Sequence, residues 1–240
     1  MRAAGILGLG LWLMSVHATL AAPIDDADAA RRRSDFATAL QLYRPLAQTG
    51  SAQAQYGLGV LYTNGNGVPQ DAAEGVRWYK LAADQGHAQA QNSLAIAYAT
   101  GRGVAQDAAE AFRLYLAAAQ QGLSAAQHNV ADSYAAGRGI ARDYTEAARW
   151  YRLAADQGNS GAQYSLGAAY GAGRGVPTDL AEAARWFRAA AEQKNTLAQY
   201  SLGLAYAAGR GVTADLAEAA KWYRVAADLG YALAQNALRS

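Results

Sequence analysis

The strongest constraint on this chain is a 36-residue sequence period that runs without insertion or deletion from residue 52 to the end. Five full copies follow one another, and a half copy, ALAQNALRS, occupies 232–240. The copies span 52–87, 88–123, 124–159, 160–195 and 196–231. An unbroken period of this length is typical of stacked repeats, in which one copy buries its apolar face only against its neighbours.

Each copy is predicted to form two antiparallel helices. In the first half, Ala90, Leu94 and Tyr98 recur at helical spacing, as do their counterparts in the other copies. In the second half, the apolar residues between 147 and 155 fall at i, i+3, i+4, i+7 and i+8 and so form one stripe. Stacked helix pairs of this kind predict an all-α fold.

The ends of the second helix carry their own signals. Each copy has Asp followed three residues later by Glu, as at Asp107 and Glu110. We expect the aspartate to accept from a free N–H of the first turn, while the glutamate reaches back to the N–H of the aspartate. A glycine such as Gly122 is expected to end the helix in a left-handed conformation. Lys194 replaces that glycine in the fourth copy, which is therefore expected to end differently.

The register also extends backwards from the first full copy. Asp35, Tyr43 and Gly50 occupy the positions that Asp, Tyr and Gly hold in that copy. Residues 22–51 are therefore predicted to form a divergent N-terminal helix pair that caps the array and lacks the glycine loop.

The repeated motifs are A-x-A-Q-x-x-L, Y-x-x-G-x-G-V, D-x-x-E-A, W-Y-x-x-A-A and a closing glycine. Together they resemble the Sel-one-like repeat (SLR) family, which is related to tetratricopeptide repeats. The resemblance covers essentially all of 24–240. It implies a right-handed α-solenoid of stacked helix pairs and an adaptor function, in which the first helices line a concave groove that binds proteins or peptides. Some bacterial members are cysteine-rich and linked to β-lactams; this chain has no cysteine, so that link is not transferred.

The N-terminus predicts export. Arg2 precedes an apolar run and a region of small residues, which is the layout of a secretory signal peptide covering 1–21, with cleavage after Ala21. An uncleaved anchor is the alternative. After cleavage we expect no membrane insertion, and a periplasmic or secreted protein. The net charge of +2, with 21 basic and 19 acidic residues, is too even to predict nucleic-acid binding.

The candidate groove residues are those that vary between otherwise uniform copies, because variation suggests freedom from the packing constraint. They occupy position five of the first helix, with Asp132 one turn later at position nine: Tyr56, Asn92, His128, Asp132, Tyr164, Tyr200 and Asn236. Tyrosine and asparagine combine apolar area with hydrogen-bonding tips. His128 and Asp132 share a helix face, and an ordinary surface pair is favoured over a metal or catalytic pair, because the sequence suggests no third partner.

The loop between the two helices reads GRG in four copies. A phosphate-binding loop normally occurs once, after a strand and before Lys-Ser/Thr, so five glycine loops after helices are interpreted as turns. Their arginines would align as a basic edge that could receive an acidic partner or a glycan: Arg102, Arg138, Arg174 and Arg210.

We therefore predict a non-catalytic protein- or peptide-binding scaffold of the bacterial cell envelope, with no cofactor, metal ion or catalytic residue. Two alternatives remain open. The chain could be a cell-wall or β-lactam hydrolase, although no nucleophile–base pair is evident. It could also be a glycan-binding module, with Tyr164 and Tyr200 contacting sugars. The tryptophan column represented by Trp150 lies in the apolar stripe, which favours core packing over sugar stacking.

Overall fold

The computed structural model of the chain describes residues 23–239, and every regular element in that range is a helix. The predicted signal peptide at 1–21 lies outside the described residues. The chain divides into two compact units that part between Gln106 and Asp107, and each is described by itself. The all-α fold class and its 36-residue period are confirmed.

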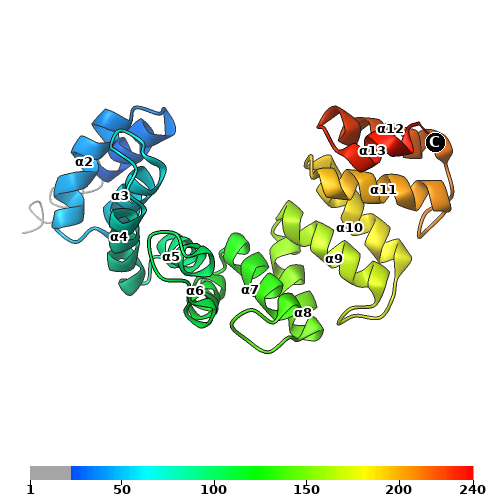
Figure 1. Ribbon diagram of the computed structural model, residues 1–240, viewed down its shortest axis with the longest axis horizontal. Helices are drawn as coiled ribbons and strands as arrows, with labels where there is room; N and C mark the ends of the chain where they lie inside the picture. Colours follow the sequence, from blue (N-terminus) through cyan, green and yellow to red (C-terminus); the bar gives the residue numbers. More distant parts are fainter. Residues whose placement is uncertain (1–22, 240) are drawn as a thin grey trace, which may run out of the picture. The chain divides into compact units, whose positions relative to one another are not determined.

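The first unit contains a helix covering 23–32 and then α2, α3, α4 and α5, while the second contains α6 to α13 (Figure 1). The first helices of the repeats are α3 (Ala52–Asn64), α5 (Ala88–Thr100), α7 (Ser124–Ala136), α9 (Ser160–Ala172), α11 (Thr196–Ala208) and the short α13 (Ala232–Ala237). The second helices are α2 (Phe36–Gln48), α4 (Ala72–Asp84), α6 (Ala108–Gln120), α8 (Tyr144–Asp156), α10 (Leu180–Glu192) and α12 (Leu216–Asp228). Within each unit, helices that follow one another in the chain pack side by side.

The aspartate at the start of each second helix caps it as expected. The Asp143 carboxylate accepts from the backbone N–H groups of Thr145 and Glu146 at 2.8 and 3.1 Å. The prediction that the glutamate accepts from the N–H of the capping aspartate is wrong. The Asp143 N–H donates to the carbonyl of Tyr134 at 3.0 Å instead. Glu146 instead pairs with Arg149 at 2.9 Å, and the same division of partners recurs in the first, fourth and fifth full repeats.

Two kinds of chain reversal alternate along the array. We call 65–71, 101–107, 137–143, 173–179 and 209–215 the glycine loops, because each carries the chain from a first helix to a second. We call 85–87, 121–123, 157–159, 193–195 and 229–231 the return turns, because each carries the chain from a second helix to the next first helix. The two kinds lie at opposite ends of the antiparallel helix pairs.

The glycine loops make contact with the preceding repeat. Gly137 and Gly139 have φ of 70° and 73°, in the left-handed region that glycine adopts without strain. A Cβ on Gly139 would lie 2.0 Å from the carbonyl oxygen of Ala108, at the start of α6. The second glycine of the loop is therefore required by close backbone packing as well as by the turn, and the loop is held against its neighbour.

The return turn at 193–195 keeps the conformation of the others although Lys194 replaces the glycine. Lys194 adopts φ of 66°, and its N–H donates to the carbonyl of Ala191 at 2.9 Å. Gly158 makes the equivalent bond to Ala155, also at 2.9 Å. The expectation that the fourth repeat ends differently is thus wrong. A Cβ on Gly158, at the equivalent turn, would meet nothing within 4 Å, so this kind of turn admits a side chain at the cost of backbone strain.

A column of glutamines joins successive helix pairs. The buried Gln163 at the start of α9 donates to the carbonyl of Ala155 in the last turn of α8, at 3.2 Å. Gln193, which follows α10, donates to the side-chain oxygen of Gln163 at 2.8 Å. Equivalent glutamines donate in the same way to the carbonyls of Ala47, Ala83, Ala119, Ala191 and Ala227. The glutamine of A-x-A-Q therefore satisfies helix carbonyls that the end of the second helix leaves open.

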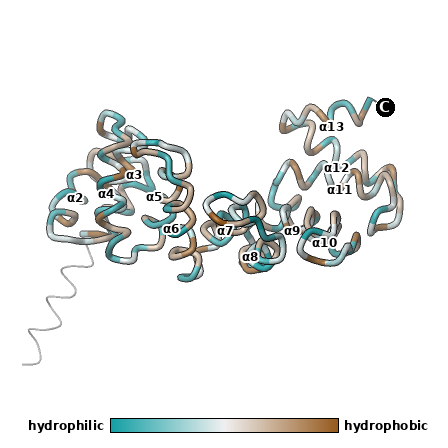
Figure 2. The backbone as a smooth tube through the Cα atoms, turned by 60° about the horizontal axis from the view of Figure 1, so that its bottom comes forward, coloured by the Kyte–Doolittle hydropathy of each residue, from teal (hydrophilic) through white to brown (hydrophobic). Residues whose placement is uncertain are grey.

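Hydrophobic and hydrophilic residues are interleaved along the helices (Figure 2), as expected where each helix buries one stripe. The core is built mainly from alanine, with larger residues such as Leu58, Leu166 and Leu202 between the helices. Among the described residues, none of the helices combines the length and the apolar character that crossing a bilayer demands.

Candidate binding site

Three clefts of the same construction occur in the array. One lies between α3, α4 and α5 in the first unit and has a volume of about 180 Å³. The other two lie in the second unit, between α7, α8 and α9 at about 160 Å³ and between α9, α10 and α11 at about 210 Å³. Each is formed by two successive first helices and the second helix that lies between them in the chain. We call them the α3–α5, α7–α9 and α9–α11 clefts.

The linings of the three clefts correspond position by position at the repeat period. All three contain a serine of the later first helix, an aromatic residue of the second helix, a position-nine residue, an alanine and a loop arginine. In chain order the residues are Tyr79, Ser93, Ile96, Ala97 and Arg102; Tyr151, Ser165, Ala168, Ala169 and Arg174; and Phe187, Ser201, Leu204, Ala205 and Arg210. Because equivalent positions of the repeat line all three, the repeat itself generates these similar sites.

The arginine is the one charged residue in the lining of each described cleft. It comes from the glycine loop and is exposed in each of the three clefts. The Arg102 guanidinium donates to the carbonyl of Thr63 at 2.6 Å, in the last turn of α3, where the helix dipole favours a cation. Three of the four arginines predicted to form a basic edge therefore line clefts, whereas Arg138 lines none of the three.

Tyr144 orients a second of these arginines. The guanidinium of Arg174 lies 5.9 Å from the centre of the Tyr144 ring, and that of Arg142 lies 5.4 Å from it. Tyr144 itself lines the α7–α9 cleft and is 36% exposed. A cation over an aromatic face keeps its charge available to a ligand while its position is restrained.

The position-five residues are more constrained than their variability suggested. The ring centres of Tyr164 and Phe187 lie 5.8 Å apart, and those of Tyr200 and Tyr223 lie 5.7 Å apart. Tyr56 packs in the same way 5.9 Å from Tyr79. The expectation that these positions are free of packing is thus wrong, because each ring covers the aromatic residue of the following second helix. Their role in binding stays a prediction.

Asn92 is half-buried on α5, and Asn236 is exposed on α13. Of the tyrosines predicted at position five, Tyr164 lines a described cleft, the α7–α9 cleft. It thereby shares that site with Arg174, so one residue from each predicted set is brought together.

His128 and Asp132 form a pair on α7, with 3.6 Å between Nε2 and the carboxylate. The structure adds a partner, since the Tyr151 hydroxyl donates to the same carboxylate oxygen at 2.6 Å. Burial, and then the hydrogen bond to this carboxylate, raise the pKa of Tyr151. A tyrosine that stays protonated and donates to a carboxylate explains the geometry as packing. Within 23–239, no three His, Cys, Asp or Glu side chains gather as metal ligands would.

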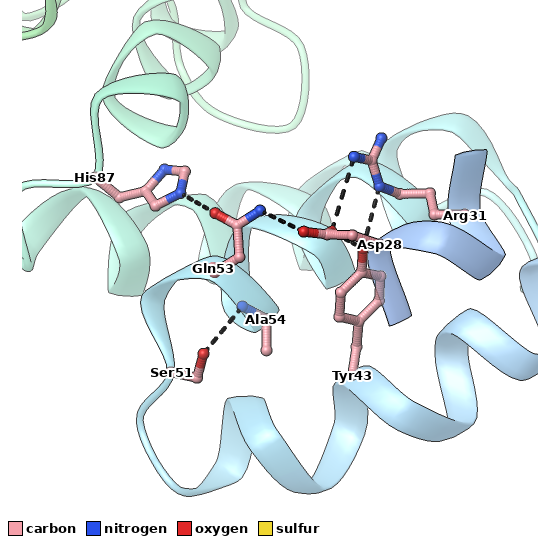
Figure 3. A network of polar contacts seen from close by, with 7 residues as sticks. All are labelled: Asp28, Arg31, Tyr43, Ser51, Gln53, Ala54 and His87. Carbon is pink, nitrogen blue, oxygen red and sulfur yellow. Dashed lines mark hydrogen bonds and ion pairs between the residues drawn. The ribbon is translucent and has the colours of Figure 1, made fainter. Parts of the chain in front are cut away.

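A second polar network lies in the first unit (Figure 3). The buried Tyr43 donates to Asp28 and accepts from Arg31 at 3.1 Å. Burial, followed by the hydrogen bond to Asp28, raises the pKa of Tyr43 to about 12. Gln53 donates to Asp28 at 2.9 Å and lies 2.7 Å from the ring nitrogen Nε2 of His87. The network thus ties the N-terminal helix to α3 and to the start of α5.

The tryptophan column packs into the core, as its place in the apolar stripe predicted. Trp150 and Trp186 are 7% and 8% exposed, which leaves no ring face for a sugar. Trp78 and Trp222 are half-buried against the cores of their own units.

Three sets of cleft residues were missed by the sequence reasoning. They are the serines such as Ser165, the aromatic residues such as Tyr151, and the rim residues Tyr144 and Leu180. Each set recurs at the 36-residue period, but the sequence gives no sign that residues from three different helices meet.

Comparison with known proteins identifies similar chains. The family model of the Sel1 repeat matches 52–87, 88–123, 124–159, 160–195 and 196–231. None of the curated proteins compared with the chain matches it. A solved protective antigen of uropathogenic Escherichia coli strains with an SLR fold is 39% identical, with a TM-score of 0.80, over 85% of this chain. This chain spans only 44% of that longer protein.

Two further solved structures are similar. A Sel1 repeat protein from Oxalobacter formigenes is 30% identical, with a TM-score of 0.84, over 90% of this chain and 86% of its own. An immunity protein from Pseudomonas aeruginosa is 17% identical, with a TM-score of 0.56, over 85% of this chain and 82% of its own. The similarity to the immunity protein, at 17% identity, shows a shared fold.

Proposed function

Because the chain belongs to the Sel1 repeat family, we propose that it is a scaffold that binds a protein or peptide in its clefts. The family fold is consistent with a protein-binding scaffold, and we propose that the clefts are its binding site. Binding would use the clefts, to which both the first helices of the predicted groove and the glycine loops of the predicted basic edge contribute. No catalytic step is part of the proposal.

One observation carries this function: the same cleft recurs at the repeat period. A small-molecule or catalytic site is usually one pocket of about 300–1,000 Å³ with convergent polar groups. Here the clefts measure about 160 to 210 Å³ and repeat with the same positions. Successive small clefts, such as the two of the second unit, match a polymer that places one side chain in each. Because helices hold the linings, little ordering entropy opposes binding.

We also propose that the protein works in the cell envelope, either in the periplasm or outside the cell. The support is the predicted signal peptide at 1–21, with cleavage after Ala21. Fractionation of cells that express the full chain, followed by mass determination of the mature protein, tests this location.

Site-specific photo-crosslinking in cells that express the full chain tests the binding site. A photoreactive residue replaces Leu204, which lines the α9–α11 cleft and is 43% exposed. The control replaces Leu153, which is 40% exposed on α8 and lies outside the three clefts. Adducts to one or a few proteins from position 204 and not from 153 support the proposal. Equal adducts from both positions, or none from position 204, would refute it.

A further inference from the structure

One column of basic residues in the second helices and one in the glycine loops recur at the repeat period, and the two differ in their partners. In the second helices, the basic residue that lies three positions after the first-turn glutamate pairs with that glutamate. The pairs measure 2.6 to 3.1 Å and are Arg77–Glu74, Arg113–Glu110, Arg149–Glu146, Arg185–Glu182 and Lys221–Glu218. Among the described residues, the ion pairs include none with Arg102, Arg174 or Arg210. The fold thus neutralises one column and leaves the other without an acidic partner.

Close backbone packing places the unneutralised column at the cleft mouths. A Cβ on Gly175 would lie 1.9 Å from the carbonyl oxygen of Tyr144, and a Cβ on Gly211 would lie 1.9 Å from that of Leu180. Each contact holds a glycine loop against the start of the preceding second helix. Tyr144 and Leu180 themselves line the same clefts as the two arginines. Each arginine therefore emerges from a restrained loop beside an apolar rim.

The cleft walls contain no acidic residue that could pair with the loop arginine. The linings of all three clefts lack aspartate and glutamate. They do contain exposed apolar side chains, with Ile96 and Leu204 both 43% exposed and Leu180 41% exposed. A site with an apolar wall and one cation fits a ligand that has an apolar group next to an anion.

We propose that the two successive clefts of the second unit, α7–α9 and α9–α11, bind an extended acidic peptide segment, a refinement that rests on the proposed function. Its apolar side chains enter these clefts, and its Asp or Glu carboxylates pair with Arg174 and Arg210. A peptide is favoured over a polyanionic glycan because a glycan has no apolar side chains to place against Ile96 or Leu204. The recurrence of the cleft favours an extended chain over a single anion.

Selection from a phage-displayed library of random peptides on the full chain tests this chemistry. We expect the selected peptides to combine Leu, Ile, Phe or Val with Asp or Glu. For a synthetic copy of one selected peptide, Arg174→Gln with Arg210→Gln should raise Kd roughly tenfold per arginine, which is the size of a charge-assisted hydrogen bond. The matched control is Arg149→Gln with Arg185→Gln, which removes the same charge from the paired column and should change Kd less than about twofold.

The outcomes separate this inference from the proposed function. Selected peptides without acidic enrichment, whose binding is lost on Leu204→Arg and kept on Arg174→Gln with Arg210→Gln, would overturn the inference and leave the scaffold standing. An equal loss in the two arginine pairs would also overturn it, because net charge alone would then explain binding. Heparin binding that depends on the loop arginines, with no peptide selected, would show a glycan site instead. Circular dichroism melts of every variant exclude unfolding as the cause of lost binding.

Discussion

The two kinds of chain reversal use the same backbone conformation in opposite surroundings. Glycines of the glycine loops and of the return turns all have positive φ. In the loops, the second glycine meets the backbone of the preceding repeat, as at Gly139. In the return turns, a Cβ on Gly86, Gly122, Gly158 or Gly230 would meet nothing within 4 Å. The loops are therefore close backbone contacts between repeats, whereas the return turns lie open at their glycines and reach the preceding repeat through side chains such as Gln193 and His87.

The largest expected effect breaks a loop contact. Gly139→Ala should lower the free energy of unfolding by about 3 kcal/mol, because left-handed strain adds to a clash with the Ala108 carbonyl. Gly137→Ala is the matched control, since its φ of 70° is similar while its nearest neighbour is the Arg142 Cβ at 3.4 Å. It should cost about 1 kcal/mol. Urea unfolding of both variants measures the difference, and equal losses would show that the loop makes no essential contact.

A substitution in a return turn should change stability only through backbone strain. Lys194→Gly should raise the free energy of unfolding by about 0.5 to 1 kcal/mol, because glycine adopts φ of 66° without penalty. The reciprocal change, Gly158→Lys, should cost a similar amount, since both turns are open. Thermal unfolding of the two variants checks the sign. A destabilised Lys194→Gly chain would mean that the lysine side chain makes a stabilising contact.

The smallest expected effect concerns His87, the last residue of a return turn. His87 caps α5 by accepting from the Ala90 N–H at 3.2 Å through Nδ1, so Nε2 carries the proton toward Gln53. Burial lowers the pKa of His87, partly offset by the charge of Asp28. A histidine with a depressed pKa stabilises the fold fully above its unfolded value, near 6.5. As the pH falls below that value, the unfolded state takes up the proton first and stability is lost.

His87→Asn tests this pH dependence with a cap that the array already uses at Asn159 and Asn195. We expect the difference in melting temperature between pH 7.5 and pH 5.5 to be smaller in the variant than in the parent chain. The two chains should unfold at similar temperatures at pH 8. An unchanged difference would mean that His87 does not carry the effect.

Much of the fold could be predicted from the sequence because each copy repeats its own boundaries. Aspartates such as Asp143 and glycines such as Gly137 mark helix ends, so the period gave both helices. The prediction for Lys194 failed because it assumed that this helix end needs glycine. The sequence does not show that the equivalent turns lie in open space, where a side chain fits. The role of Gln163 was missed because its partner, the Ala155 carbonyl, is a backbone group with no sequence signal.

The candidate site was predictable only in part. The sequence singled out Arg174 and Tyr164 separately, on the grounds of an aligned loop and a variable position. Their meeting in one cleft depends on three helices and on the loop contact at Gly175. Variation at position five was also misleading as a sign of freedom from packing. The ring of Tyr164 packs against Phe187, and the ring of Tyr200 packs against Tyr223. A residue can therefore vary between repeats and still pack.

The most direct test of the central claim is amide hydrogen exchange on the full chain, with and without a peptide that it binds. We expect a bound peptide to slow exchange in the glycine loops at 173–179 and 209–215, which border the two clefts of the second unit. The return turns at 157–159 and 193–195 lie at the other ends of the helices and should exchange as before. Slowed exchange confined to the return turns would contradict the claim that the clefts and their arginines form the binding site.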